Sequence, residues 1–268
     1  MKKVVSHLPD VASEPDRRGV ALHAVGIRGL RLPIRILGAD QVEQVVVALA
    51  DLSVDIEADQ RGTHMSRLVS VLYEWSSTVQ SPEGVRSLLQ LTQEWLQSRR
   101  AHLKLQFPYF LKVHAPATQS EGLLDVEVAW ECGLNNGASS AESYFAFPAM
   151  TLCPCSKEIS DYGAHNQRAI VRLWLRTKDR HPRLPDAYLP LVRDSVSALV
   201  YPILKRPDEK YVTERSYETP RFVEDVVREL VLRLQGREEF CWFRVECESI
   251  ESIHNHNAFA LYEAPRTK

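Results

Sequence analysis

Two cysteines and a histidine share one short polar segment, in which Cys153 and Cys155 flank a proline and His165 follows. Thiolate and imidazole are the side chains best suited to hold a borderline-soft metal ion, or to serve as nucleophile and base. The apolar run 144–152 directly before Cys153 predicts a buried strand. Groups at the end of a strand are held more firmly than groups in a long loop, so we expect the chemistry here.

This segment does not predict a closed structural zinc site. Such a site needs four ligands, commonly in two compact Cys-x-x-Cys pairs. The sequence has one Cys-x-Cys and no second pair. An open site with room for water fits better, in which Cys153 or Cys155 supplies sulfur, His165 supplies nitrogen, and a carboxylate from elsewhere in the chain completes the set.

A second polar cluster, near the end of the chain, contains Glu251, His254 and His256. Two histidines at positions i and i+2 of a strand point to the same side. Because histidine titrates near neutral pH, the pair predicts proton transfer or a role beside a metal. The alternative is a solvated hairpin turn with no chemical role.

Two further carboxylates are candidates. Glu209 lies in a predicted turn just after a helix, where acidic side chains are normally only solvated. Glu224 lies in the first turns of a predicted helix, beside its apolar stripe. A partly buried carboxylate there could accept two N–H bonds from a planar amide-and-amine edge such as that of guanine. The alternative for Glu224 is a favourable charge at a helix N-terminus.

The segment 61–67 resembles an anion-binding turn that leads into a helix. Arg61, His64 and Arg67 offer charged side chains, and the first helical turn offers free backbone N–H groups. The segment lacks the pattern of a phosphate-binding P-loop. The alternative is a helix cap with two surface arginines.

Strands and helices that could position these groups follow in the same order twice: strand, two helices, strand, strand. Alternating or continuous apolar runs predict strands at residues 23–37, 42–56, 103–113, 123–131, 144–152, 168–177, 240–247 and 258–262. Helical spacing of apolar residues predicts helices at residues 63–75, 81–96, 188–204 and 219–235. We therefore expect an α+β fold, with an antiparallel sheet covered on one face by helices.

Composition limits the possible functions. The chain has 268 residues, 44% of them hydrophobic and 25% charged, with a formal charge of −2, which argues against a general nucleic-acid or membrane binder. Residues 1–20 are polar and predict a mobile leader without an export signal. Five cysteines without such a signal favour reduced thiols and a cytoplasmic location. Cys132, Cys241 and Cys247 lie in strand-like runs and predict ordinary core or surface positions.

Taken together, these segments resemble the prokaryotic type IB GTP cyclohydrolases, also called the GTP cyclohydrolase IV family. The segment from Leu152 through Cys153-Pro-Cys155 to Ser160 is the most specific, together with the Tyr162 to Arg168 stretch. The resemblance extends over residues 60–257, and the other segments that carry it are 61–67, 205–209, 222–225 and 254–256.

The resemblance implies a tunnelling fold of two fused modules, residues 21–150 and 151–268. It implies a homo-oligomer, a tetramer in this family, with active sites at subunit interfaces. It also implies that GTP and water are converted to formate and 7,8-dihydroneopterin triphosphate, the first step of tetrahydrofolate synthesis. The implied cofactor is a divalent metal, Mn, Fe or Zn.

The resemblance also assigns roles by position. Cys153, His165 and Glu209 resemble metal-site residues, with Cys155 as the alternative thiolate. Cys153 is favoured because it directly follows the strand. Glu224 resembles the carboxylate that anchors guanine.

Further roles concern proton transfer and the phosphates. Glu251, His254 and His256 resemble residues that line the reacting end, where they would act with Cys153 in catalysis. The triphosphate needs cations, and the candidates are Arg61, His64, Arg67, Lys157 and Arg168.

Two other functions fit part of the pattern. One is a tunnelling-fold nitrile reductase that acts on a deazaguanine, with Cys153 as covalent nucleophile and a nicotinamide cofactor in place of a metal. The other is a non-catalytic oligomer in which the Cys/His cluster only holds subunits together through a metal. The second leaves Glu224 and the His254/His256 pair without a role.

Overall fold

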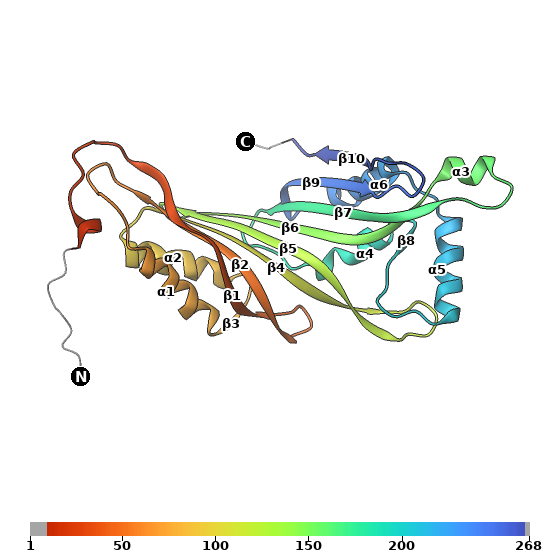
Figure 1. Ribbon diagram of the computed structural model, residues 1–268, viewed down its shortest axis with the longest axis horizontal. Helices are drawn as coiled ribbons and strands as arrows, with labels where there is room; N and C mark the ends of the chain where they lie inside the picture. The colour runs from red at the N-terminus through yellow and green to blue at the C-terminus, as the bar shows by residue number, and fades with distance from the viewer. Residues whose placement is uncertain (1–9, 266–268) are drawn as a thin grey trace.

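One large, twisted and curved sheet dominates the computed structural model, which describes residues 10–265 (Figure 1). Its strands lie in the order β10-β9-β7-β6-β5-β4-β2-β1-β3, and β8 pairs with β6 beside this path. Neighbouring strands are antiparallel except for the short parallel contact of β1 with β3. The predicted antiparallel sheet is therefore confirmed.

The strands, in chain order, are β1 (Leu22–Leu37), β2 (Glu43–Ile56), β3 (Val79–Gln80), β4 (Arg100–His114), β5 (Glu121–Asn135), β6 (Ala138–Leu152), β7 (Asn166–Thr177), β8 (Ala198–Leu199), β9 (Phe240–Ser249) and β10 (Ala258–Glu263). The helices are α1 (Met65–Ser76), α2 (Gly84–Leu96), α3 (Pro154–Ile159), α4 (Leu189–Arg193), α5 (Arg206–Glu218) and α6 (Val223–Gln235), with 3-10 turns η1 (Val11–Ser13) and η2 (Pro185–Ala187).

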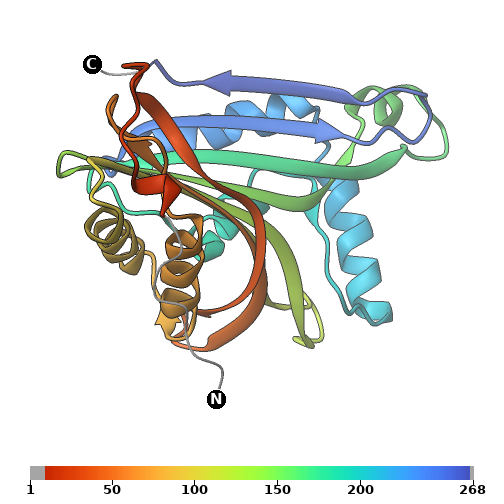
Figure 2. The same cartoon turned by 60° about the vertical axis from the view of Figure 1, so that its left-hand side comes forward.

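Alternation along the strands explains why the sheet has one buried and one open face. In β4, Leu103, Leu105 and Phe107 are buried, whereas Lys104 and Gln106 between them point to the other side. Helices α1, α2 and α6 turn their apolar stripes toward the buried face, so helices cover that side of the sheet (Figures 1 and 2).

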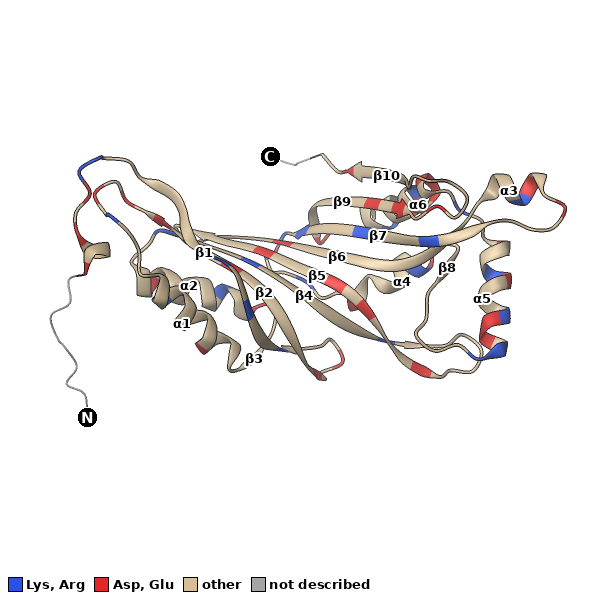
Figure 3. Ribbon diagram, in the orientation of Figure 1, with Lys and Arg blue, Asp and Glu red and all other residues tan. Residues whose placement is uncertain are grey.

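The core lies between the sheet and these helices. Trp130 of β5 is fully buried at its centre, with its ring 5.1 Å from that of Phe107 and its indole N–H donating to the carbonyl of Arg183 at 2.8 Å. Within the described part of the chain, no helix is long and apolar enough to cross a membrane. Acidic and basic residues are mixed along the elements, as on α5 (Figure 3).

The predicted strands are confirmed, with most ends displaced outward by a few residues. The helices at 63–75 and 81–96 are also confirmed, as α1 and α2. Helix α2 begins at Gly84 rather than at Ser81, because residues 81–84 form a turn in which the N–H of Gly84 donates to the carbonyl of Ser81 at 3.0 Å. The helix expected from residue 219 begins only at Val223, where the side chain of Asp225 accepts a hydrogen bond from the backbone N–H of Phe222 at 3.0 Å.

The single helix predicted over residues 188–204 is wrong. Its place is taken by the short helix α4 and the strand β8, which pairs with Ala149 and Met150 of β6. Long-range pairing with the sheet overrides local helix propensity here. Ser197 joins this pairing, since its hydroxyl accepts the backbone N–H of Leu152 at 3.1 Å.

The turn predicted around Glu209 is also wrong, because residues 206–218 form helix α5. Its only buried side chains are Asp208, Val212 and Ser216, so the sequence carries no apolar stripe that would indicate a helix. The two histidines expected on a strand lie instead in the loop 250–257, which joins β9 to β10. The hairpin of these two strands is confirmed.

The division into modules at residue 150 falls inside β6. Helices nevertheless lie between strand pairs in both halves, α1 and α2 in the first and α4, α5 and α6 in the second, and two fused modules remain a prediction. Of the predicted leader, residues 1–9 lie outside the described residues. The rest forms the turn η1 and a bridge between Pro15 and Gln60.

Candidate functional site

Most of the predicted chemistry meets at one hollow of about 310 Å³, at the end of β6, β7 and β9 where α6 begins. The strand ends, the first residues of α6 and the loop 250–257 form its walls. Its lining residues are Thr151, Cys153, His165, Gln167, Arg221, Phe222, Val223, Glu224, Ser249, Glu251, His254, His256, Ala258 and Phe259. In Figure 1 this is the end of the sheet that carries α3 and α6.

Cys153 and His165 are held next to each other by backbone hydrogen bonds. The N–H of Cys153 donates to the carbonyl of His165 at 3.1 Å, and the N–H of His165 donates to the Ser156 hydroxyl at 3.2 Å. The N–H of Ser156 in turn points at the Cys153 sulfur, 3.5 Å away. Cys153 thus caps α3 and faces the hollow, whereas Cys155 is exposed and is not part of the lining.

His165 is linked to Glu251 through Gln167. The Nδ1 atom of His165 lies 2.9 Å from Oε1 of Gln167, and Nε2 of Gln167 lies 3.5 Å from Oε1 of Glu251. The same Nε2 lies 3.3 Å from the Thr151 hydroxyl, which is itself 3.2 Å from the Ser249 hydroxyl. Thr151, Gln167 and Ser249 come from β6, β7 and β9, so the sheet fixes these three, whereas His165 directly precedes β7 and Glu251 lies in the loop 250–257.

His254 and His256 also line the hollow and are both exposed. Their rings stack with centroids 5.2 Å apart and an interplanar angle of 21°. The far end of their loop is tied to β9, because the side-chain amide of Asn257 donates to Glu248 at 2.9 Å. The near end is tied to β7 by the N–H of Ile250, which donates to the carbonyl of Arg168 at 2.8 Å.

Glu224 occupies the first turn of α6 and is exposed in the wall of the hollow. The capping role belongs to its neighbour Asp225, and Glu224 has no hydrogen bond or ion pair with another described side chain. Both of its oxygens are therefore available to a ligand. Sequence reasoning missed Arg221, which lines the same wall and whose buried Nε has no acceptor among the described residues.

Glu209 is not at the hollow in this chain. It lies on α5 and is exposed, whereas its neighbour Asp208 is fully buried. Burial alone would raise the pKa of Asp208, but hydrogen bonds from the hydroxyl and N–H of Thr118 and from two other backbone N–H groups hold that pKa well below its usual range. Asp208 thus fastens α5 to the loop between β4 and β5.

The side chains predicted to bind the triphosphate also lie outside this hollow. Arg61, His64 and Arg67 lie at the start of α1, at the other end of the sheet (Figure 1). Lys157 donates from Nζ to the carbonyl of Tyr217 at 2.5 Å. Arg168 is next to buried Ala169 on β7, so its side chain points to the face opposite Ala169.

The three side chains at the start of α1 already have partners within the chain. Arg61 forms an ion pair with Glu14, and His64 lies 3.5 Å from Asp10. The guanidinium of Arg67 donates to the carbonyl of Trp95 at 3.2 Å. Within one chain these residues therefore stabilise the start of α1.

Over residues 10–265, no three His, Cys, Asp or Glu side chains are grouped so as to hold a metal ion. Cys153 and His165 nevertheless supply sulfur and nitrogen donors at one hollow, a set that suits Mn, Fe or Zn. The bond from His165 Nδ1 to Gln167 is of the kind that commonly orients a metal-binding imidazole. The donors present therefore fit a divalent metal.

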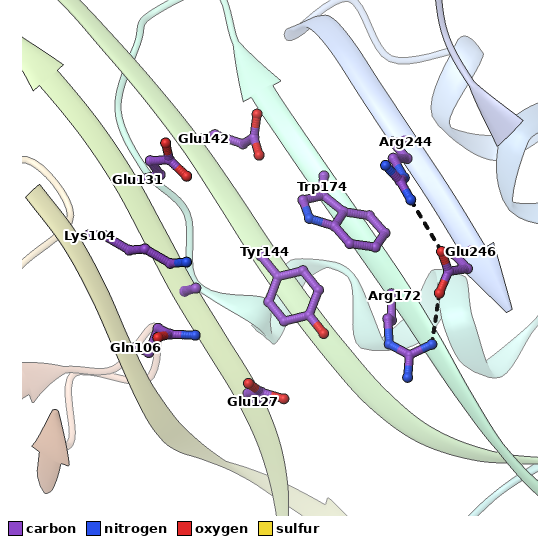
Figure 4. Close-up of a pocket in the computed structure, with 11 residues that line it drawn as sticks. Lys104, Gln106, Glu127, Glu131, Glu142, Tyr144, Arg172, Trp174, Arg244 and Glu246 are labelled. Atoms are coloured by element: carbon purple, nitrogen blue, oxygen red, sulfur yellow. Dashed lines mark hydrogen bonds and ion pairs between the residues drawn. The ribbon is translucent and has the colours of Figure 1, made fainter. Parts of the chain in front are cut away.

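A second hollow, of about 410 Å³, lies on the open face of the sheet (Figure 4). Its charges largely satisfy one another. Arg172 contacts Glu246 and Glu248 at 2.8 Å each, and Arg244 contacts Glu246 at 3.3 Å. Since Glu248 also accepts from Asn257, this ion-pair network extends to the loop that carries the two histidines.

Solved structures with a similar fold are uricases. A uricase from Bacillus fastidious matches with a TM-score of 0.53 and 7% identity, over 93% of this chain and 94% of that one. A thermostable uricase variant matches with the same TM-score and identity, over 91% of each chain. The fold is therefore the predicted tunnelling fold.

Comparison with known sequences identifies the family. Proteins described as GTP cyclohydrolase FolE2 from Desulfovibrio desulfuricans and Dictyoglomus thermophilum are 44% and 43% identical to this chain. The matches cover 98% and 95% of this chain and 97% of each relative. Residues 8–260 match the family described as type I GTP cyclohydrolase folE2. The chain belongs to this family.

Proposed function

We propose that the protein is a GTP cyclohydrolase that hydrolyses the imidazole ring of GTP to give formate and 7,8-dihydroneopterin triphosphate, at the entry to folate synthesis. It is thus a hydrolase acting on carbon–nitrogen bonds of a cyclic amidine. The observation that carries the proposal is the meeting of Cys153, His165, Glu224 and the His254/His256 loop at one hollow, in a chain of this family.

Glu224 fixes the base. Its free carboxylate can accept the N1–H and the 2-amino group of guanine together, which no other common purine offers in this arrangement. Fixing that edge directs the imidazole ring, and its C8 atom, to the Cys153 and His165 side of the hollow.

His254 and His256 move protons. Opening the ring requires protonation of a ring nitrogen as water adds to C8, and later proton transfers as the C–N bonds break. A positioned general acid or base contributes roughly 10²- to 10⁴-fold to such a step. The stacked pair and Glu251 all line the hollow, which supports this role.

A divalent metal at Cys153 and His165 would supply hydroxide at neutral pH by lowering the pKa of bound water. The hollow contains two of the three predicted metal ligands and none of the side chains predicted to bind the triphosphate. This supports a site that is completed by another subunit. We therefore assign Glu209 to the metal, and Arg61, His64, Arg67, Lys157 and Arg168 to the phosphates, within a homo-oligomer, as a tetramer. Cytoplasmic location remains a prediction from cysteine usage.

The test is a reconstitution. The purified protein is stripped with chelator, resupplied with Mn, Fe or Zn separately, and given GTP while formate and the fluorescence of oxidised pterin are followed. We expect both products in equal amounts with at least one metal. GTP left unchanged with every metal would refute the proposal.

The same preparation separates the two other functions. A nitrile reductase would consume a reduced nicotinamide with a deazaguanine nitrile and without metal. A metal-held scaffold would dissociate on chelation, as seen by light scattering, and would form no pterin. Neither outcome is compatible with the proposed cyclohydrolase.

A further inference from the structure

Gln167 is the side chain that joins His165 to Glu251 within the hollow. It lies on β7, half-buried, two residues after His165. Its amide has three polar neighbours: Nδ1 of His165 at 2.9 Å, the Thr151 hydroxyl at 3.3 Å and Oε1 of Glu251 at 3.5 Å. The sequence singled out His165 and Glu251 but gave Gln167 no role.

The identity of these neighbours determines which way the amide points. The amide nitrogen of Gln167 only donates, and it faces two oxygen acceptors, the Thr151 hydroxyl and Oε1 of Glu251. The amide oxygen then faces His165, and because that oxygen only accepts, the proton must be on Nδ1 of His165. The Ser252 hydroxyl, 3.4 Å from the same Nδ1, can accept as well. The Nε2 atom of His165 is left with its lone pair.

We propose that Gln167 is a positioning residue, which holds His165 in the tautomer protonated on Nδ1 and couples that imidazole to Glu251. The lone pair on Nε2 is the form of imidazole that binds a metal. This inference rests on the proposed function for the identity of the bound group, but the tautomer follows from hydrogen bonding alone.

Glutamine suits this position because it can donate and accept at the same time. A glutamate side chain in its place could still accept from Nδ1 of His165, but it would set a second carboxylate against Glu251. A methionine side chain, of similar size, would offer neither bond. The variants Gln167→Glu and Gln167→Met therefore separate the contact with His165 from the contact with Glu251.

The first measurement uses the full chain, free of metal and labelled with ¹⁵N in histidine. Nitrogen shifts and their couplings to the ring protons report which nitrogen of His165 carries the proton; the His165→Gln variant identifies its signals. We expect the Nδ1–H form in the wild type and in Gln167→Glu. In Gln167→Met we expect a mixture that contains the Nε2–H form.

The second measurement is affinity for Mn, Fe and Zn by competition with a chelator. We expect Gln167→Met to bind about 10- to 100-fold more weakly than the wild type, the range for loss of a partner that orients a metal-binding histidine. Gln167→Glu should recover most of this affinity while its kcat for GTP stays low, because its link to Glu251 is broken.

Gln44→Met is the matched control. The amide of Gln44 also makes two hydrogen bonds, to the backbone N–H and carbonyl of Phe110 at 3.0 and 2.9 Å, but outside the hollow. It should lower thermal stability at least as much as Gln167→Met does, without a change in the tautomer of His165 or in metal affinity.

Two results would overturn the role of Gln167: an unchanged tautomer and affinity in Gln167→Met, or an equal loss of affinity in Gln44→Met. A wild-type protein that binds none of the three metals would refute the proposed function instead. In that case the tautomer measurement still decides whether Gln167 orients His165.

Discussion

Glu224→Ala should abolish recognition of guanine while leaving the fold and the metal in place. The carboxylate is exposed and has no partner among the described side chains, so its removal breaks no contact within the protein. In the complex it would accept two charge-assisted hydrogen bonds, each contributing about 1.5–3 kcal/mol. Losing both costs about 3–6 kcal/mol, which lowers kcat/KM roughly 10²- to 10⁴-fold.

The assay follows pterin fluorescence and formate over a range of GTP concentrations, with bound metal and thermal midpoint measured on the same preparation. Inosine triphosphate, which lacks the 2-amino group, should be a poor substrate for the wild type and should be no worse than GTP for Glu224→Ala. Glu94→Ala, which removes an exposed carboxylate from α2, is the control and should behave as the wild type. A kcat/KM within about threefold of wild type, or loss of metal in Glu224→Ala, would show that the reasoning is wrong.

Three further outcomes are expected. Cys153→Ser should lose metal and turnover, whereas Cys155→Ser should keep both, because only Cys153 lines the hollow; metal analysis and the pterin assay check this. Asn257→Ala should lower kcat more than it raises KM, because it frees the histidine loop from Glu248, and steady-state kinetics measure the split. The pKa of Asp208 is depressed in the folded state, so its contribution to stability is present above about pH 4 and is lost as the pH falls below that value. Asp208→Asn should therefore lower the thermal midpoint at pH 7, with a smaller difference at pH 3; an equal difference at both would contradict the assignment.

The sequence predicted strands well because their signal is local. In β4 and β5, buried and exposed residues alternate for most of the strand length, and this period of two is visible without any partner strand. The apolar stripe of α6, from Val226 to Leu234, is equally local. Such patterns fix the type of each element and the face that it buries.

The errors occurred where distant residues decide the conformation. Residues 188–204 read as a helix, but pairing of Ala198 and Leu199 with β6 holds part of them extended. Helix α5 was missed because its main anchor is polar: buried Asp208 accepts hydrogen bonds from Ala117 and Thr118, which are far away in the sequence. Neither partner could be inferred from the segment itself.

The candidate site shows the same division. Residue types and spacing alone selected Cys153, His165, Glu224 and the histidine pair, because few side chains can bind a metal, hold guanine or move protons near neutral pH. Only the tertiary structure decided that they share one hollow, that Cys153 rather than Cys155 faces it, and that Gln167 connects His165 to Glu251. The structure also left Glu209 and the triphosphate cations outside it. The chemistry of a side chain is a property of a single residue, so the sequence alone reveals it. The distance between these side chains depends instead on long-range contacts, namely the pairing of β6, β7 and β9 and the packing of the start of α6.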